Sequence, residues 1–156
     1  MILLIQPLGN KYDFLTIRIP NGLLHVAAPL VEDGYDVAIV DQKIDFDWKE
    51  KVTSYLNQGV TCVGVTCSTG NMISHALSVS KFVRETSPNV PIVWGGPHPS
   101  LLPEQTLETS EYIDIVVINE GDEIFHDLVK TLENKGDLKT VEGICFKDPK
   151  TLETIR

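Results

Sequence analysis

The sequence predicts a doubly wound α/β domain, in which helices cover both faces of a parallel β-sheet. Short apolar runs recur along the chain, and segments with the helical spacing of apolar residues lie between them. The chain has 156 residues, of which 42% are hydrophobic and 22% are charged. This length and composition are typical of one globular domain with a buried core.

Five apolar runs are the predicted strands, and they occupy residues 2–5, 37–40, 60–65, 92–94 and 113–118. Each run is continuous with little alternation, as in parallel strands that are covered on both faces. Five such strands favour the flavodoxin-like strand order 2-1-3-4-5. The first run is too short to cross a bilayer and has no basic flank or cleavage site, so we expect a cytoplasmic protein without membrane contact.

Helices are predicted where apolar residues repeat at helical spacing. Clear stripes cover residues 23–31, 73–83 and 124–132, and weaker ones cover 48–56 and 99–107. Pro29 should bend the first of these helices, and Pro103 should break the short one. After residue 136 the pattern changes to a β-hairpin over 141–147 and 152–156 with a turn at 148–150. We therefore expect a domain over residues 1–136 and a hairpin connector over 137–156.

Composition excludes several classes of function. Thirteen basic and 22 acidic residues give a net charge of −9, without the basic cluster that nucleic-acid binding needs. The three cysteines and four histidines show no metal-ligand spacing, so no metal site is predicted. Buried structural thiols and a reducing compartment are the simpler interpretation of the cysteines. No serine lies in a nucleophile-elbow motif, and we expect no catalytic residue in this chain.

Ligands of open α/β sheets bind outside the carboxyl ends of the strands, where the strand order reverses. The loop after the first strand, residues 6–20, contains Gly9 and Asn10 but no Gly-x-Gly-x-x-Gly, and the chain has no Walker motif, which disfavours NAD and ATP. The loop at 66–71 is rich in hydroxyl side chains, which can either cap a helix or bind a ligand. The pair Gly95-Gly96 favours close approach of a ligand to the backbone. Acidic residues at 120–123 can act simply as partners of a helix dipole.

Taken together, these loops resemble one known family. The residues that carry the resemblance are Thr66-x-Ser68-Thr69, Trp94-Gly95-Gly96-Pro97-His98-Pro99-Ser100, Asn119-Glu120-Gly121-Asp122 and the stretch 20–28 with 34–37. This set is similar to the N-terminal cobalamin-binding (vitamin B12-binding) domain of cobalamin-dependent radical-SAM enzymes. The similarity covers roughly the whole chain. Asn119 departs from the family, which more often has glycine there.

The resemblance implies that the nucleotide tail of cobalamin enters the crevice at the strand ends. The implied contacts are Thr66, Ser68, Thr69, Gly95, Gly96, His98, Asn119, Glu120 and Gly121. Many other cobalamin-binding domains carry a cobalt-ligating histidine in the first loop, whereas residues 6–20 contain none. We therefore expect cobalamin without a histidine lower ligand, with the lower face of the cobalt against residues 8–13, including Leu8, Gly9 and Asn10. His25 is expected to lie too far along its helix to interfere.

The cysteine triplet of a radical-SAM cluster is missing from the chain. The resemblance implies that a catalytic domain with a [4Fe-4S] cluster and S-adenosylmethionine follows in a longer protein, of methyltransferase or oxidative-cyclase type. Two other classes of domain have the same kind of sheet and remain as alternatives: a receiver-like regulatory domain and a sugar-nucleotide-binding half domain. A receiver needs acidic residues after the first strand and an aspartate at the end of the third, where this chain has Gln6-Pro7 and Thr66.

Overall fold

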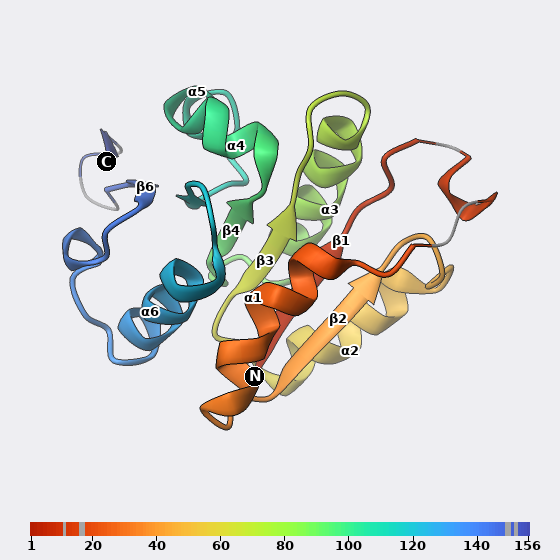
Figure 1. Ribbon diagram of the computed structural model, residues 1–156, viewed down its shortest axis with the longest axis horizontal. Coiled ribbons are helices and arrows are strands. Elements are labelled where there is room, and N and C mark those ends of the chain that lie inside the picture. The colour runs from red at the N-terminus through yellow and green to blue at the C-terminus, as the bar shows by residue number, and fades with distance from the viewer. Residues whose placement is uncertain (11, 16–17, 149–150, 152) are drawn as a thin grey trace.

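The fold is built on one twisted sheet, seen in the computed structural model in Figure 1. The structure describes residues 1–10, 12–15, 18–148, 151 and 153–156. The sheet order is β2-β1-β3-β4-β5-β6-β7. The strands are β1 (Ile2–Gln6), β2 (Val37–Asp41), β3 (Val63–Thr66), β4 (Ile92–Gly95), β5 (Ile115–Val117), β6 (Ile144–Lys147) and β7 (Thr154–Ile155). All pairs among the first five strands are parallel, which confirms the predicted order 2-1-3-4-5.

Helices cover both faces of this sheet, as predicted for a doubly wound fold (Figure 1). The helices are α1 (Asn21–Glu32), α2 (Trp48–Gln58), α3 (Met72–Thr86), α4 (Pro97–Leu101), α5 (Pro103–Glu108) and α6 (Asp122–Glu133), with 3₁₀ turns at Asp13–Leu15 and Leu138–Thr140. Buried residues of α1 and α6 form one hydrophobic cluster with the sheet. Buried residues of α2, α3 and α5 form the other.

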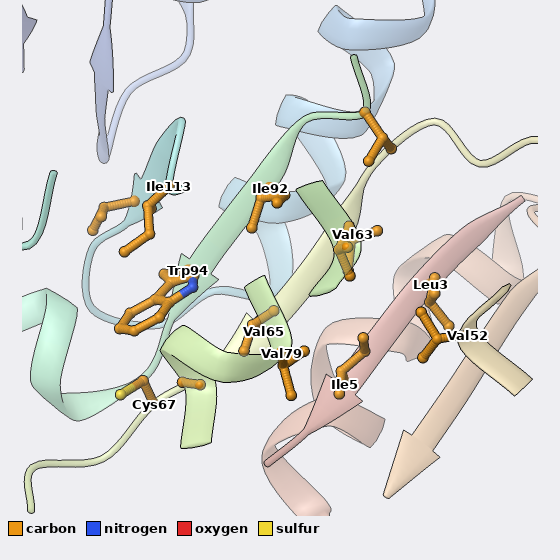
Figure 2. Packing of buried hydrophobic residues seen from close by; sticks show 14 of the residues in the cluster. Leu3, Ile5, Val52, Val63, Val65, Cys67, Val79, Ile92, Trp94 and Ile113 are labelled. Carbon is orange, nitrogen blue, oxygen red and sulfur yellow. The ribbon is translucent and has the colours of Figure 1, made fainter. Parts of the chain in front are cut away.

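Alternation along the strands sends neighbouring side chains into different clusters. Leu3 and Ile5 pack with the α2 and α3 side, whereas Leu4 between them packs with the α1 and α6 side. Figure 2 shows the cluster on the α2 and α3 side, where the indole of Trp94 lies among aliphatic side chains. The indole Nε1 donates a hydrogen bond of 2.9 Å to the buried Ser80 Oγ. Alternate residues of each strand therefore face opposite sides of the sheet.

The C-terminal hairpin extends the sheet rather than standing apart from it. Strand β6 pairs antiparallel with β5, and β7 pairs antiparallel with β6. The predicted hairpin is thus present, although three residues of its turn region (149, 150 and 152) lie outside the described residues. The short helix after β4 is divided at Pro103, as predicted, and it begins two residues earlier, at Pro97, than we expected.

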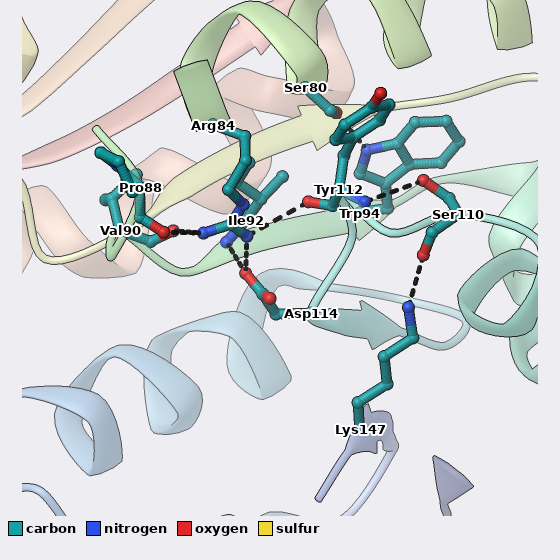
Figure 3. A network of polar contacts seen from close by, with 10 residues as sticks. All are labelled: Ser80, Arg84, Pro88, Val90, Ile92, Trp94, Ser110, Tyr112, Asp114 and Lys147. Carbon is teal, nitrogen blue, oxygen red and sulfur yellow. Dashed lines mark hydrogen bonds and ion pairs between the residues drawn. The ribbon is translucent and has the colours of Figure 1, made fainter. Parts of the chain in front are cut away.

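A polar network lies at the amino edge of the sheet, opposite the carboxyl ends of the strands (Figure 3). Arg84 of α3 donates to the carbonyls of Pro88 and Val90 at 2.6 and 3.2 Å. It also reaches Asp114 at 2.5 Å, and Asp114 accepts a second bond of 2.8 Å from the Ile92 amide. One arginine therefore ties the end of α3 to the starts of β4 and β5.

Candidate functional site

The candidate site is a cavity of about 560 Å³ at the carboxyl edge of the sheet, on the face covered by α1 and α6. Its floor is formed by strand residues, its two walls by α1 and α6, and its rim by the loops after β4 and β5. The lining residues are Leu4, Gly22, Leu23, His25, Val26, Gly64, Val65, Thr66, Val93, Gly95, Gly96, Pro97, Ser100, Val117, Asn119, Glu120, Gly121, Asp122 and Phe125. The volume lies in the range of pockets that hold small molecules and cofactors.

The strand registers arrange the floor in rows. Leu4 pairs with Gly64, and Gly64 pairs with Val93, so these three residues form one row across the sheet. We call them the deep row. Thr66 and Gly95 pair two residues closer to the strand ends and lie at the mouth. The floor is therefore apolar inside and carries its first hydroxyl group at the mouth.

The two floor glycines, Gly64 and Gly95, have different surroundings. A Cβ atom on Gly95 would meet nothing within 4 Å, so the position faces open space. A Cβ on Gly64 would lie 2.7 Å from Leu4 Cδ2 and 3.3 Å from Phe125 Cζ. At Gly64 the neighbouring side chains already pack against the backbone, as a glycine inside a strand allows.

Gly96 allows the backbone conformation and close packing of the loop after β4. Its φ of +98° favours glycine, and a Cβ there would lie 3.0 Å from the Cys67 carbonyl oxygen. The same carbonyl accepts a 3.1 Å bond from the His98 amide. Both of the paired glycines line the cavity; a Cβ on Gly95 would face open space, whereas Gly96 packs tightly against the loop after β3.

Ser100 joins the two halves of the rim. Its hydroxyl donates to the Gly96 carbonyl at 2.8 Å and accepts from the Asn119 amide at 2.9 Å. Asn119 has a φ of +65°, in the left-handed region that favours glycine and that asparagine tolerates better than most residues. The departure from the family pattern at this position is therefore compatible with the turn.

These features belong to a known family. A family model described as the B12 binding domain matches residues 14–129. The chain belongs to the B12-binding domain family. The predicted resemblance to such domains of cobalamin-dependent radical-SAM enzymes is thereby confirmed.

The relatives of this B12-binding domain are longer proteins. An anaerobic magnesium-protoporphyrin IX monomethyl ester cyclase of Synechocystis sp. is 33% identical over 143 residues, which cover 87% of this chain and 28% of the relative. An uncharacterized methyltransferase of Pyrococcus horikoshii is 33% identical over 132 residues, which cover 83% and 28%. The chain thus spans little more than a quarter of the length of these two relatives.

Solved structures share the fold of the B12-binding domain. The radical S-adenosylmethionine methyltransferase TsrM from Kitasatospora setae, solved with cobalamin and a [4Fe-4S] cluster bound, has a TM-score of 0.84 at 20% identity, covering 99% of this chain and 28% of TsrM. The cobalamin-dependent S-adenosylmethionine radical enzyme OxsB, solved with aqua-cobalamin and S-adenosylmethionine bound, has a TM-score of 0.78 at 20% identity, covering 99% and 21%.

The structure divides the predicted site residues of this B12-binding domain into two groups. Six of them line the cavity, namely Thr66, Gly95, Gly96, Asn119, Glu120 and Gly121. The other six, Leu8, Gly9, Asn10, Ser68, Thr69 and His98, lie in the loops after β1, β3 and β4, outside the cavity lining. Thr69 Oγ1 lies 3.5 Å from His98 Nδ1, which brings the loops after β3 and β4 together.

Side-chain hydrogen bonds connect residues 8–10, directly after β1, to their surroundings. Asp13 accepts from the Gly9 amide at 2.5 Å and from Asn10 Nδ2 at 2.6 Å. Gln42, which follows β2, accepts from the Leu8 amide at 3.0 Å. Gln42 therefore holds Leu8 at the sheet edge, and Asp13 holds Gly9 and Asn10 within the same segment.

Sequence reasoning missed several lining residues. Gly64 could have been found, because a glycine inside a strand marks a close approach. His25 was not among the predicted site residues, yet it lines the wall that α1 contributes; the expectation that it lies too far along its helix to reach the cobalt stays a prediction. Whether it lines the cavity depends on how α1 is rotated about its axis relative to the sheet, and the sequence pattern does not give that rotation.

The cysteines of the B12-binding domain are buried free thiols, as predicted. Burial raises the pKa of Cys62 and of Cys67 to about 12, so both stay protonated at neutral pH. Within the described ranges, His, Cys, Asp and Glu residues form no group of three that could hold a metal ion. No helix of the described part of the chain is long and apolar enough to span a bilayer.

Proposed function

We propose that this chain is the cobalamin-binding domain of a radical-SAM enzyme, and that the cavity between α1 and α6 receives the nucleotide tail of the cofactor. The observation that carries the proposal is the place of the cavity in a B12-binding domain. It opens at the carboxyl edge of the sheet and is lined by the Gly95-Gly96 loop and by the loop at Asn119–Gly121. That edge is where open α/β sheets bind their ligands.

The residues present fit such a tail. Its planar base can lie over the deep row, because Gly95 leaves open space beside that row. Its sugar and phosphate then lie at the mouth, near the hydroxyl of Thr66 and the imidazole of His25. The amino-terminal ends of α1 and α6 lie at the same edge, where helix dipoles favour a phosphate.

The corrin ring would then extend over the neighbouring strand ends. Ser68, Thr69 and His98 remain our predicted contacts on one side, and Leu8, Gly9 and Asn10 remain those below the cobalt. The bonds that Asp13 and Gln42 accept fix the positions of these three residues, which supports a role of Leu8, Gly9 and Asn10 below the corrin. Because residues 6–20 contain no histidine, we propose that the cofactor is bound without a histidine lower ligand.

The chemistry belongs to the complete enzyme. Cobalamin supplies the reactive centre, while this domain supplies binding and orientation. We propose that residues 1–136 form the cofactor domain and that 137–156 lead to a radical-SAM domain with a [4Fe-4S] cluster and S-adenosylmethionine, catalysing a methyl transfer or an oxidative cyclisation. The lengths of the relatives support this division of labour. The three reduced, buried thiols suit a cytoplasmic enzyme.

Reconstitution with hydroxocobalamin tests the proposal. The purified chain should leave a gel-filtration column coloured, with the visible spectrum of bound cobalamin. Gly95→Leu should raise the dissociation constant at least about tenfold, because the new side chain enters the open floor. Ala28→Leu, on an exposed position of α1, is the matched control and should bind normally. A colourless wild-type protein, or full binding by Gly95→Leu, contradicts the proposal.

The lower ligand has its own test. The spectrum of the bound cofactor should show no histidine on the cobalt, and His25→Ala should leave the band positions unchanged. A histidine-ligated spectrum that disappears in His25→Ala would overturn this part of the proposal alone.

A further inference from the structure

The cavity is polar at its mouth and apolar in its depth. The lining residues with polar side chains are His25, Thr66, Ser100, Asn119, Glu120 and Asp122. They belong to the second turn of α1, to the first turn of α6, to the last residue of β3 and to the segments after β4 and β5. All of these positions lie at the carboxyl edge of the sheet.

The side chains that line the deep part of the cavity are all apolar. The deep row consists of Leu4, Gly64 and Val93, and Phe125 faces it from the wall that α6 contributes, since a Cβ on Gly64 would lie 3.3 Å from Phe125 Cζ. The backbone groups of the deep row belong to interior strands β1, β3 and β4, which pair on both sides. A polar group placed there finds no free hydrogen-bond partner among these residues.

We propose that this cavity selects cobamides with a benzimidazole lower base over cobamides with a purine lower base. The inference rests on the proposed function, because it requires the nucleotide tail to occupy the cavity. The sugar and phosphate stay at the polar mouth, so the far ring of the base reaches the deep row. In dimethylbenzimidazole that ring is a benzene ring with two methyl groups. In adenine it carries ring nitrogens and an amine.

Polarity rather than size carries the selection. Both bases are planar bicyclic rings of similar dimensions, and a cavity of about 560 Å³ holds either. Burial of the methylated benzene ring removes apolar surface from water, which is favourable. Burial of the adenine nitrogens removes their hydrogen bonds to water without replacement, which is unfavourable.

Three corrinoids separate the possible outcomes, with dissociation constants measured by equilibrium dialysis on the 156-residue chain. The inference predicts that cobalamin binds at least about tenfold more tightly than the adenine-containing cobamide. Equal affinity for these two overturns the inference and leaves the proposed function intact. Cobinamide, which lacks the nucleotide tail, should bind most weakly. If it binds as tightly as cobalamin, the tail does not use the cavity, and both proposals fail.

A pair of variants tests the role of the deep row directly. Val93→Thr adds a hydroxyl at the floor of the cavity at nearly constant volume. Val116→Thr makes the same change on the neighbouring strand, where Val116 is fully buried in the cluster on the opposite face. Val93→Thr should lower the ratio of the dissociation constant of the adenine-containing cobamide to that of cobalamin at least about threefold. Val116→Thr should leave this ratio unchanged. Equal effects of the two variants, or none at Val93, overturn the inference.

Discussion

Replacement of the two floor glycines by alanine should change stability in opposite directions. At Gly64 the added Cβ would lie 2.7 Å from Leu4 Cδ2, about 1 Å short of an ordinary carbon–carbon contact. The added Cβ would also lie 3.3 Å from Phe125 Cζ, so it cannot move away from Leu4 toward Phe125. Leu4 must therefore leave its rotamer or shift toward the cavity, which it also lines. Overpacking of this kind costs about 1–3 kcal/mol.

Alanine also restricts the unfolded backbone, which returns about 0.5–1 kcal/mol at either site. The free energy of unfolding of Gly64→Ala should therefore fall by about 1 kcal/mol. That of Gly95→Ala should rise by about 0.5 kcal/mol, because its Cβ meets nothing within 4 Å. Urea unfolding of the cofactor-free variants, followed by circular dichroism, measures both values. If Gly64→Ala is as stable as Gly95→Ala, the packing argument is wrong.

Two further changes act away from the cavity. Arg84→Ala should lower the free energy of unfolding by about 2 kcal/mol, because Asp114 and three backbone carbonyls lose their charged donor; cobalamin affinity measured on the folded variant should not change. Asp33→Asn tests a pH dependence. The hydrogen bond from Lys130 first, and that from His126 second, lower the pKa of Asp33 below its ordinary 3.8. A lowered carboxyl pKa stabilises the folded state above the ordinary value, and this contribution disappears as the pH falls through the folded pKa. The stability difference between wild type and Asp33→Asn should therefore be larger at pH 7 than at pH 2.5, and a difference that grows on acidification would contradict this assignment.

The sequence predicted the fold well because its signals are local. Each predicted parallel strand is a short apolar run, and each run contains an observed strand or overlaps one. The ends were less accurate. The predicted run 113–118 is longer than β5, which covers Ile115–Val117. Asp114, before the strand, accepts a hydrogen bond from Arg84, and Asn119, just after the run, has a positive φ. The pairing of β6 with β5 was not predicted, since it depends on β5 being left at the edge of the parallel sheet.

The site was harder to predict because it depends on register. Nothing local in the sequence states that Leu4, Gly64 and Val93 lie side by side, since the strands that carry them are far apart in the chain. The motif residues Thr66, Gly95 and Asn119 were found because each loop carries its own signal. Ser100 was missed because its function is a contact between two loops.

The cavity follows from how α1 and α6 meet. At the amino edge of the sheet they are joined, because Asp33 at the end of α1 accepts from His126 Nε2 at 2.8 Å and from Lys130 Nζ at 2.9 Å. At the other edge Gly121 precedes α6, and a Cβ there would lie 3.5 Å from Val26 Cγ2, so the two helices are kept at a distance set by a glycine. The two helices are thus in contact at both levels, and the cavity lies between them and the sheet. Under the proposed function, affinity for cobalamin depends on how well the nucleotide tail matches this lining, which is why substitutions at the floor are the most informative.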